Sequence, residues 1–451
     1  MKKVTLDATD ENVLQSIQNK VGDRNARIQE FIQILDLIPG NRFISIDARW
    51  GEGKTFFVRQ IEKTLEYITL KNFGTEDSEN RYQKMASYFA DTALRDIELS
   101  KSYLPIYYNA WLYDTHTDPL MSLLYVIIKK SGSVVDTKLS TTTGDKIKGI
   151  LSSIQCGIGI FNGAFNASIN GNDVVNNFEN KNILDEIQLA EDIREKVKEI
   201  FDEVIKERAQ KLVIFIDELD RCRPSYALEI LERIKHYFDD DRIIFVVSVN
   251  KEQLTHTISN YYGSGFDSTA YLNKFFDIEA HLPQLQTYDR DIDTGNREQY
   301  FLNSISKSLV RYYKLTMRDF LIYREKIHNL EMCSLINDRS MRGVCASLFV
   351  PIIIILDMID IKEKNKFISG DTKFLEIMKM IPEGKNLYEC CGESNLDMND
   401  RVEDGYMKIK AVYDFIFGNL TVEEFRERNI MLIDGFKEKM LSCCGQMSLY
   451  I

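Results

Sequence analysis

One stretch constrains the fold of this chain more than any other: residues 43–65, FISIDARWGEGKTFFVRQIEKTL. Its first four residues have the apolar character of a buried strand, its centre contains two glycines, and its last part predicts a helix. Gly51 and Gly53 let successive backbone N–H groups point inward around an anion at the helix N-terminus, where the helix adds partial positive charge. The stretch therefore predicts a loop that binds phosphate groups between a strand and a helix.

Lys54 and Thr55 occupy the last two positions of the pattern G-x-x-x-x-G-K-[ST]. In that pattern the lysine reaches the β- and γ-phosphates of a nucleotide, and the hydroxyl ligates Mg²⁺. The first glycine is replaced here by Ala48, which fits with little strain if its φ is below zero. The alternative is an ordinary turn that opens a helix. The residues expected to contact the nucleotide are Trp50, Gly51, Glu52, Gly53, Lys54, Thr55 and Phe56.

A second motif lies in residues 211–223, KLVIFIDELDRCR. Its apolar residues predict a strand buried on both faces, and the acids that follow stand at the carboxyl end, where ligands bind in open α/β sheets. Asp217 can hold Mg²⁺ through water, as the aspartate of such a strand does. Glu218 is placed to polarise the attacking water, and Asp220 is its rival for that role. The alternative is a strand followed by an acidic turn in solvent.

Three further stretches predict strands, at residues 104–110, 242–249 and 272–282, and helical patterns separate them. Residues 71–83 have the polar character of a surface segment. Five strands joined by helices predict a doubly wound α/β sheet with the named polar residues along one edge. Asn250 ends the fourth strand, where it could contact the γ-phosphate or the attacking water, or could cap the next helix.

The character of the chain changes after residue 283, where a polar linker precedes helical patterns that continue almost to the end. We therefore expect a sheet domain over residues 1–290 and a helical domain over residues 291–451. Thr316 is predicted to cap a helix of the second domain. Arg318, in the first turn of that helix, could sense the γ-phosphate or form an ordinary surface ion pair.

Composition limits the class of protein. The net charge of −12 means that contact with nucleic acid would need a local basic patch, and no such patch is evident. Eight cysteines without C-x-x-C spacing give no zinc motif and predict reduced thiols in a cytoplasmic protein. The N-terminal sequence MKKVTLDATDENV turns acidic before any apolar run, unlike a signal peptide.

Two apolar stretches are compared with the roughly 20 residues that a membrane helix requires. Residues 348–359, LFVPIIIILDMI, are too few and contain Asp357, so we predict a buried helix with Pro351 in its first turn. Residues 149–169, GILSSIQCGIGIFNGAFNASI, are uncharged, but their polar content suits hydrocarbon poorly. We expect them to belong to a Gly-, Ser- and Asn-rich insertion near residues 131–180, with membrane association as the alternative.

Five motifs occur in order and at compatible spacing within residues 22–330: W-G-E-G-K-T (50–55), Y-N-A-W (108–111), F-I-D-E-L-D-R-C-R-P (215–224), F-V-V-S-V-N-K (245–251) and Y-L-N-K-F-F (271–276). Together they resemble the KAP family of P-loop NTPases. The tryptophan before the loop glycine and the pattern I-D-x-L-D-R are far more specific than a phosphate-binding loop alone.

The resemblance implies a three-layer α/β ATPase of the additional-strand type, with parallel sheet order 5-1-4-3-2 and an all-α C-terminal domain. It implies that Lys54, Thr55 and Asp217 carry ATP and Mg²⁺. Family members commonly insert membrane helices where residues 149–169 stand here, so this chain resembles a soluble branch. Asn250 is a second departure, because the family usually has aspartate there. Bacterial members are often associated with phage exclusion, which implies by analogy a defence ATPase.

The sequence favours an ATPase that couples nucleotide state to conformational change or partner assembly. A nucleotide-gated switch that turns over negligibly and recruits an effector is the first alternative, and a DNA-loading or translocating ATPase is the second. The expected partners are further copies of the chain or other defence-system proteins, while direct binding of nucleic acid stays open. Arg221 or Arg223 could serve a neighbouring subunit's site as an arginine finger, or pair with the nearby acids.

Overall fold

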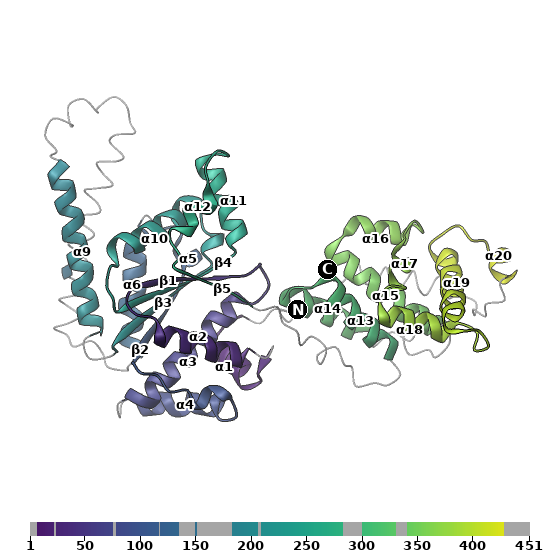
Figure 1. The fold of residues 1–451 in the computed structure, drawn as a ribbon, viewed down its shortest axis with the longest axis horizontal. Helices are drawn as coiled ribbons and strands as arrows, with labels where there is room; N and C mark the ends of the chain where they lie inside the picture. The colour runs from purple at the N-terminus through teal and green to yellow at the C-terminus, as the bar shows by residue number, and fades with distance from the viewer. Residues whose placement is uncertain are drawn as a thin grey trace. The chain divides into compact units, whose positions relative to one another are not determined.

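The computed structural model describes residues 7–21, 24–74, 78–116, 118–134, 149–150, 183–205, 209–282, 300–330 and 341–427. Contacts within the chain separate it into two compact units (Figure 1), one made of residues 7–284 and the other containing residues 285–451. We call them the sheet unit and the helical unit.

The sheet unit is built on five strands. They are β1 (Arg42–Asp47), β2 (Tyr103–Asn109), β3 (Lys211–Asp217), β4 (Ile243–Val249) and β5 (Ile278–His281). All neighbouring strands pair in parallel, in the order β2-β3-β4-β1-β5. This order is 5-1-4-3-2 counted from the opposite edge, so the expected topology is confirmed. Every residue of β3 and β4 is buried, which explains why their sequences are continuous apolar runs without alternation.

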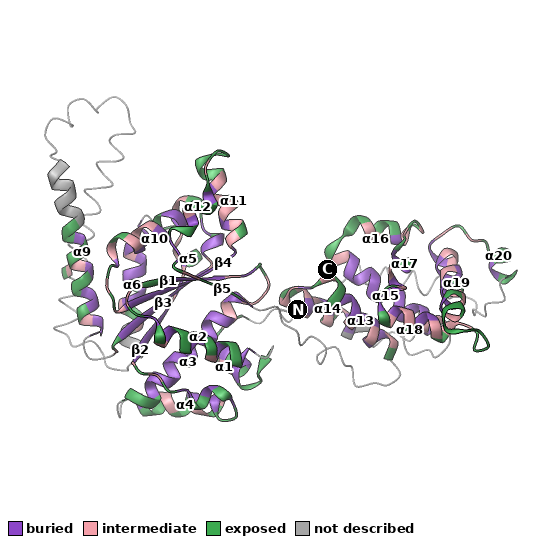
Figure 2. Cartoon of the chain, in the orientation of Figure 1, coloured by how far each residue is buried: buried purple, intermediate pink, exposed green. Residues whose placement is uncertain are grey.

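Helices cover both faces of the sheet. One buried cluster packs α1 (Asp10–Gln18), α2 (Asn25–Leu37), α3 (Lys54–Phe73), α4 (Glu79–Phe89) and the short η3 (Ala93–Asp96) against the sheet. The opposite cluster draws on α6 (Pro119–Val134), α9 (Ile183–Ile205), α10 (Pro224–Tyr237), α11 (Lys251–Tyr262) and α12 (Ser268–Asn273). Figure 2 shows the buried strands between the two sets of helices. The expected three layers are therefore confirmed.

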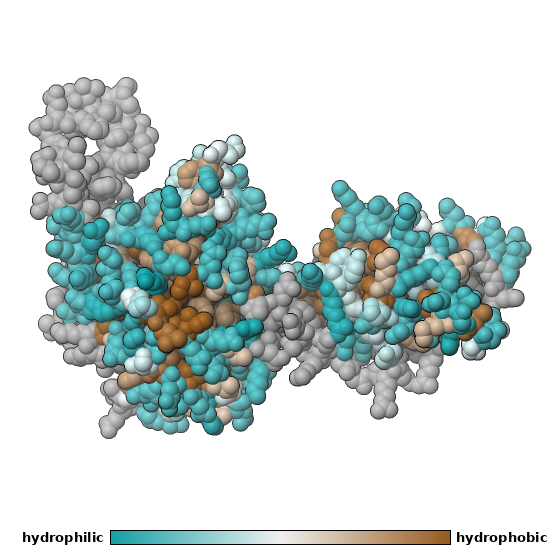
Figure 3. Space-filling model, in the orientation of Figure 1, coloured by the Kyte–Doolittle hydropathy of each residue, from teal (hydrophilic) through white to brown (hydrophobic). Residues whose placement is uncertain are grey.

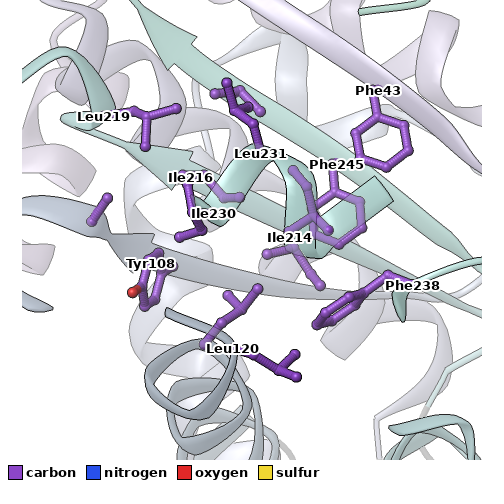
Figure 4. Close-up of a cluster of buried hydrophobic side chains, with 14 of the residues drawn as sticks. Phe43, Tyr108, Leu120, Ile214, Ile216, Leu219, Ile230, Leu231, Phe238 and Phe245 are labelled. Carbon is purple, nitrogen blue, oxygen red and sulfur yellow. The ribbon is translucent and has the colours of Figure 1, made fainter. Parts of the chain in front are cut away.

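Aromatic rings fill part of the second cluster. Figure 4 shows Phe43, Phe238 and Phe245 together beside the aliphatic side chains of β3 and α10. The Phe43 and Phe245 rings stack with centroids 5.0 Å apart, and Phe238 meets Phe245 edge-on at 5.4 Å. Because Phe43 and Phe245 come from paired strands, these contacts tie β1 to β4.

The segment 71–83 lies at the surface as predicted, since most of its described residues are exposed, and much of it is helical, because α3 continues to Phe73 and α4 begins at Glu79. One prediction of a strand boundary is wrong. The last strand does not begin at residue 272, because α12 reaches Asn273 and β5 begins only at Ile278. Phe275 and Phe276 are buried but do not belong to a strand. Their apolar side chains therefore indicate burial and not an extended backbone. Apart from residues 149–150, the segment 149–169 lies outside the described residues.

The helical unit contains α13 (Tyr300–Tyr313), α14 (Met317–Leu330), α15 (Met341–Ile359), α16 (Ile361–Ile368), α17 (Phe374–Met378), α18 (Pro382–Cys391), α19 (Met398–Ile416) and α20 (Val422–Glu427). Its described residues form helices and connecting loops around their own buried cluster. The Thr316 hydroxyl accepts a hydrogen bond from the Asp319 N–H at 3.3 Å, as expected of the cap of α14. Hydrophilic side chains cover most of the surface that Figure 3 shows of both units, and an apolar patch interrupts them on the sheet unit.

The helix α15 forms the centre of the helical unit. Pro351 lies in its interior and not in its first turn as predicted, because the helix begins ten residues earlier, at Met341. Of the helices in the described residues, α15 is the one long and apolar enough to cross a membrane, with a mean hydropathy of 2.0. Its most apolar window is 72% buried within the protein, and packing against the other helices accounts for that apolar character.

Candidate functional site

The phosphate-binding loop predicted from the sequence connects the carboxyl end of β1 to the first turn of α3. Gly51 and Gly53 have φ values of 88° and 85°, in the left-handed region that favours glycine. Ala48 is not among the non-glycine residues with positive φ, so the expectation that alanine fits there is confirmed. The Ala48 N–H donates to the Val249 carbonyl at 3.2 Å, which continues the pairing of β1 with β4 into the loop.

Arg24, just before α2, is hydrogen-bonded to the backbone of this loop. Its buried guanidinium donates to the Gly53 carbonyl at 2.9 Å and also to the Glu52 carbonyl. A side chain at Gly53 would meet the Arg24 Nη1 atom 2.9 Å from its Cβ. Sequence reasoning missed Arg24, because no local pattern connects an arginine before α2 with a loop almost thirty residues later.

Lys54 lies inside the curve of the loop. Its ammonium donates to the Ala48 carbonyl at 2.7 Å and to the Arg49 carbonyl at 3.4 Å, and lies 4.0 Å from Asp220 Oδ2. Burial lowers the pKa of this ammonium, and the neighbouring carboxylates, Asp220 foremost, partly offset that effect. The loop therefore contains a cation held close to its own backbone and facing the acids that follow β3.

Asp217, the last residue of β3, is buried and has one carboxylate oxygen with a partner. Its Oδ2 accepts a hydrogen bond from the Tyr107 hydroxyl at 2.9 Å. Its Oδ1 has no hydrogen-bond partner in the described part of the chain. An unpartnered buried carboxylate oxygen is costly, so this atom is a place where a ligand would be stabilising.

Glu218 follows in the left-handed region, with a φ of 61° that is unusual for a residue with a side chain. Its Oε1 accepts a hydrogen bond from the Thr55 hydroxyl at 3.3 Å, and its Oε2 pairs with the Arg221 guanidinium. Burial and the nearby Asp217 raise the pKa of the Glu218 carboxyl, and Arg221 opposes that rise. The first turn of α3 and the acids after β3 are thus in direct contact.

Asp220 joins three parts of the site. Its Oδ2 accepts hydrogen bonds from the Trp50 indole N–H at 2.5 Å and from the Asn250 backbone N–H at 3.1 Å. Its Oδ1 is buried and has no partner in the described residues. Together with its approach to Lys54, these contacts make Asp220 a tie between the loops that follow β1, β3 and β4.

The remaining predicted residues have identifiable places. The Asn250 side-chain oxygen accepts from the Gln253 N–H at 3.2 Å and so caps α11, the second of its two predicted roles. The Glu52 carboxylate accepts from the Arg49 N–H at 2.9 Å, and Phe56 is half-buried in the first turn of α3. Arg221 also lies over the Trp111 ring, 5.7 Å from its centroid.

The other two candidate arginines are Arg223, just before α10, and Arg318, in α14. Arg223 donates from its backbone N–H to the Asp114 carboxylate at 3.3 Å and from its guanidinium to the Asp114 carbonyl. Arg318 belongs to the helical unit, where its side chain is exposed in α14. The arginine-finger role suggested for Arg221 or Arg223 stays a prediction.

The residues that are present fit a magnesium nucleotide. Among the described residues, no group of three or more His, Cys, Asp or Glu side chains could hold a metal by itself. Mg²⁺ in a P-loop site needs no such group, because it takes one Ser or Thr hydroxyl, one aspartate, water and the phosphate oxygens. Thr55 and the unpartnered Asp217 Oδ1 match that donor set, and Lys54 supplies the cation for the phosphates.

Comparison with known proteins agrees with this geometry. Residues 24–349 match the model of the KAP family P-loop domain, which spans Arg24, all five strands and the first helices beyond the sheet unit. No curated protein matches the chain.

Proposed function

Because the chain belongs to the KAP family of P-loop NTPases, we propose that its sheet unit binds ATP with Mg²⁺ and hydrolyses the γ-phosphate bond. One observation carries the proposal: Thr55, on the turn that also holds Lys54, contacts Glu218 beside a buried aspartate that has a free oxygen. A phosphate-binding turn and a pair of acids in contact form the arrangement that nucleotide hydrolysis requires.

Each residue has a distinct role in this proposal. Lys54 and the N–H groups of the loop bind the β- and γ-phosphates, while Thr55 and Asp217 hold the metal. The metal, when bound, neutralises charge that develops on the phosphate oxygens. Glu218 orients the attacking water and accepts its proton, a role that suits a carboxyl whose pKa is raised by burial. Asp220 keeps the three loops in register, because its Oδ2 accepts hydrogen bonds from Trp50 and Asn250, and it stays the rival acid for the role of base.

We further propose that nucleotide state is coupled to a change between the sheet unit and the helical unit, or to assembly with partners. The supported context, by analogy with bacterial relatives of the family, is a cytoplasmic defence system in which the chain forms oligomers or complexes. This step rests on fold-level analogy, whereas the proposal that the sheet unit binds a nucleotide rests on the family and on the geometry of the site.

A nucleotide-gated switch with negligible turnover is the second candidate, and one observation favours it. Both oxygens of the Glu218 carboxylate are engaged, one by Thr55 and one by Arg221. A base held in this way must lose a partner before it can accept a proton from water. DNA translocation has no comparable support, since the net charge of −12 opposes contact with phosphates.

Removing the metal tests the proposal on the wild-type chain. We expect phosphate release from ATP in the presence of Mg²⁺. EDTA should abolish this release, because Thr55 and Asp217 supply only two ligands and cannot retain the metal against a chelator. The measurement is steady-state phosphate release together with equilibrium binding of a fluorescent ATP analogue. Stoichiometric binding without turnover would favour the switch, and absence of any binding would contradict both candidates.

Replacing Arg221 with alanine should shift the pH dependence of hydrolysis. Arg221 opposes the rise in the Glu218 pKa, so its removal raises that pKa further. A base with a higher pKa takes up its proton at higher pH, so the acid limb of the pH profile of kcat should move to higher pH. The control is Arg27→Ala, which breaks an exposed ion pair with Glu30. An acid limb that stays in place, or moves to lower pH, would rule out the contact as a determinant of catalysis.

A further inference from the structure

The hydrogen bond to Asp217 comes from β2, outside both the phosphate-binding loop and the strand that carries Asp217. Tyr107 lies on β2, opposite Phe215 in the pairing with β3, while Asn109 is opposite Asp217. Side chains two residues apart on a strand share a face of the sheet, so Tyr107 is on the same face as Asp217. Its hydroxyl reaches Asp217 Oδ2 at 2.9 Å.

This hydroxyl is the one hydrogen-bond donor to the Asp217 side chain in the described part of the chain. The second carboxylate oxygen, Oδ1, is buried without a partner. The phenol is an O–H donor and the carboxylate is an acceptor, so Tyr107 donates this hydrogen bond. The tyrosine thus determines which oxygen of Asp217 is left for a ligand.

Tyr107 is itself held by the helix that begins with Lys54 and Thr55. Arg59 lies in the second turn of α3, and its guanidinium lies over the Tyr107 ring with the Cζ atom 4.5 Å from the centroid. Two carboxylates fix that guanidinium, because Arg59 forms ion pairs with Glu62 on α3 and with Asp10 on α1. Arg59 and Glu62 are both buried, so the stack is not a contact of mobile surface side chains.

We propose that Tyr107 is a positioning residue for the metal ligand Asp217, and that Arg59 holds the Tyr107 ring in place. The proposal rests on the proposed function, which assigns Asp217 to Mg²⁺. The helix α3 supplies the Thr55 hydroxyl to the metal. Through Arg59 and Tyr107, the same helix also orients the Asp217 carboxylate. Hydrogen-bond partners of metal-ligating carboxylates commonly set metal affinity in this way.

The test is metal affinity, measured by the electron paramagnetic resonance signal of free Mn²⁺ at a saturating concentration of a non-hydrolysable ATP analogue. For Tyr107→Phe we expect the Mn²⁺ dissociation constant to rise by about 10- to 100-fold. Binding of the analogue without metal should be unchanged, because the phenol contacts no part of the phosphate-binding loop in the described hydrogen bonds. A merely structural defect would lower the number of sites without changing the affinity of those that remain.

The neighbouring tyrosine provides a matched control. The Tyr108 hydroxyl is also buried on β2, but it bonds to Ser122 at 2.8 Å and to Tyr226 at 2.6 Å. Tyr108→Phe therefore removes a buried hydrogen-bonding hydroxyl from the same strand without touching Asp217. Its Mn²⁺ affinity should equal that of the wild type even if its melting temperature falls.

Arg59 is tested with lysine, because alanine would leave the buried Glu62 without its cation. Arg59→Lys retains the charge and loses the planar group that stacks on the ring, so Mn²⁺ affinity should fall in the same direction as in Tyr107→Phe. Wild-type Mn²⁺ affinity in Tyr107→Phe would overturn the inference while leaving the proposed function intact. A wild-type chain that binds the analogue but no Mn²⁺, or binds neither, would overturn both.

Discussion

Glu218→Gln should bind ATP like the wild type and hydrolyse it about 10²- to 10⁴-fold more slowly, the range that a general base contributes. The amide has the size of the carboxylate and can still accept a hydrogen bond from Thr55, so the site should keep its shape. It cannot take a proton from water at neutral pH. The measurement is single-turnover phosphate release beside equilibrium ATP binding, which separates the chemical step from affinity.

The control for this variant is Glu252→Gln, which makes the same change at an exposed position in the first turn of α11. Its turnover should equal that of the wild type. Unchanged turnover in Glu218→Gln would remove Glu218 from the chemistry. In that event Asp220, the rival acid, would be the next residue to test by Asp220→Asn.

Lys54→Ala should lose ATP affinity rather than the chemical step alone. The buried ammonium is surrounded by Asp217, Glu218 and Asp220, and without it these carboxylates would face the triphosphate directly. A charge-assisted hydrogen bond contributes roughly 1.5–3 kcal/mol, so we expect the ATP dissociation constant to rise by about 10- to 100-fold. Equilibrium binding of ATP, measured by titration calorimetry, gives this value directly.

Lys71→Ala is the matched control, because Lys71 is an exposed lysine in the last turn of the same helix. It should bind ATP with wild-type affinity. ATP affinity in Lys54→Ala within twofold of the wild type would place the nucleotide elsewhere. Equal turnover in Lys54→Ala and Glu218→Gln would contradict the assignment of both residues.

The local geometry that the sequence predicted correctly, namely glycines with positive φ before a helix and an acid at the end of a buried strand, has a signal that is local in the chain. Gly51, Gly53 and Lys54 lie within four residues of one another, and the loop geometry that they need depends on their own backbone. Asp217 was recognisable because a strand buried on both faces has a continuous apolar sequence, so the first acid after it marks the carboxyl edge.

The parts that were missed depend on contacts between distant segments. Arg24 lies before a helix with no motif of its own, and only the fold brings it to the carbonyls of the loop. Tyr107 looks like an ordinary apolar residue of a strand, and only the register of β2 against β3 places its hydroxyl beside Asp217. Phe275 and Phe276 illustrate the same limit, because an apolar run indicates burial without indicating which backbone conformation provides it.

The central claim is that a magnesium triphosphate lies between the turn that holds Lys54 and Thr55 and the acids that follow β3. The most direct test is a crystal structure of the chain with Mn²⁺ and a non-hydrolysable ATP analogue, in which anomalous diffraction locates the metal. The account predicts a manganese peak within coordination distance of the Thr55 hydroxyl, with Asp217 as a direct ligand or one water away. A nucleotide bound at another place, or a metal distant from both residues, would contradict it.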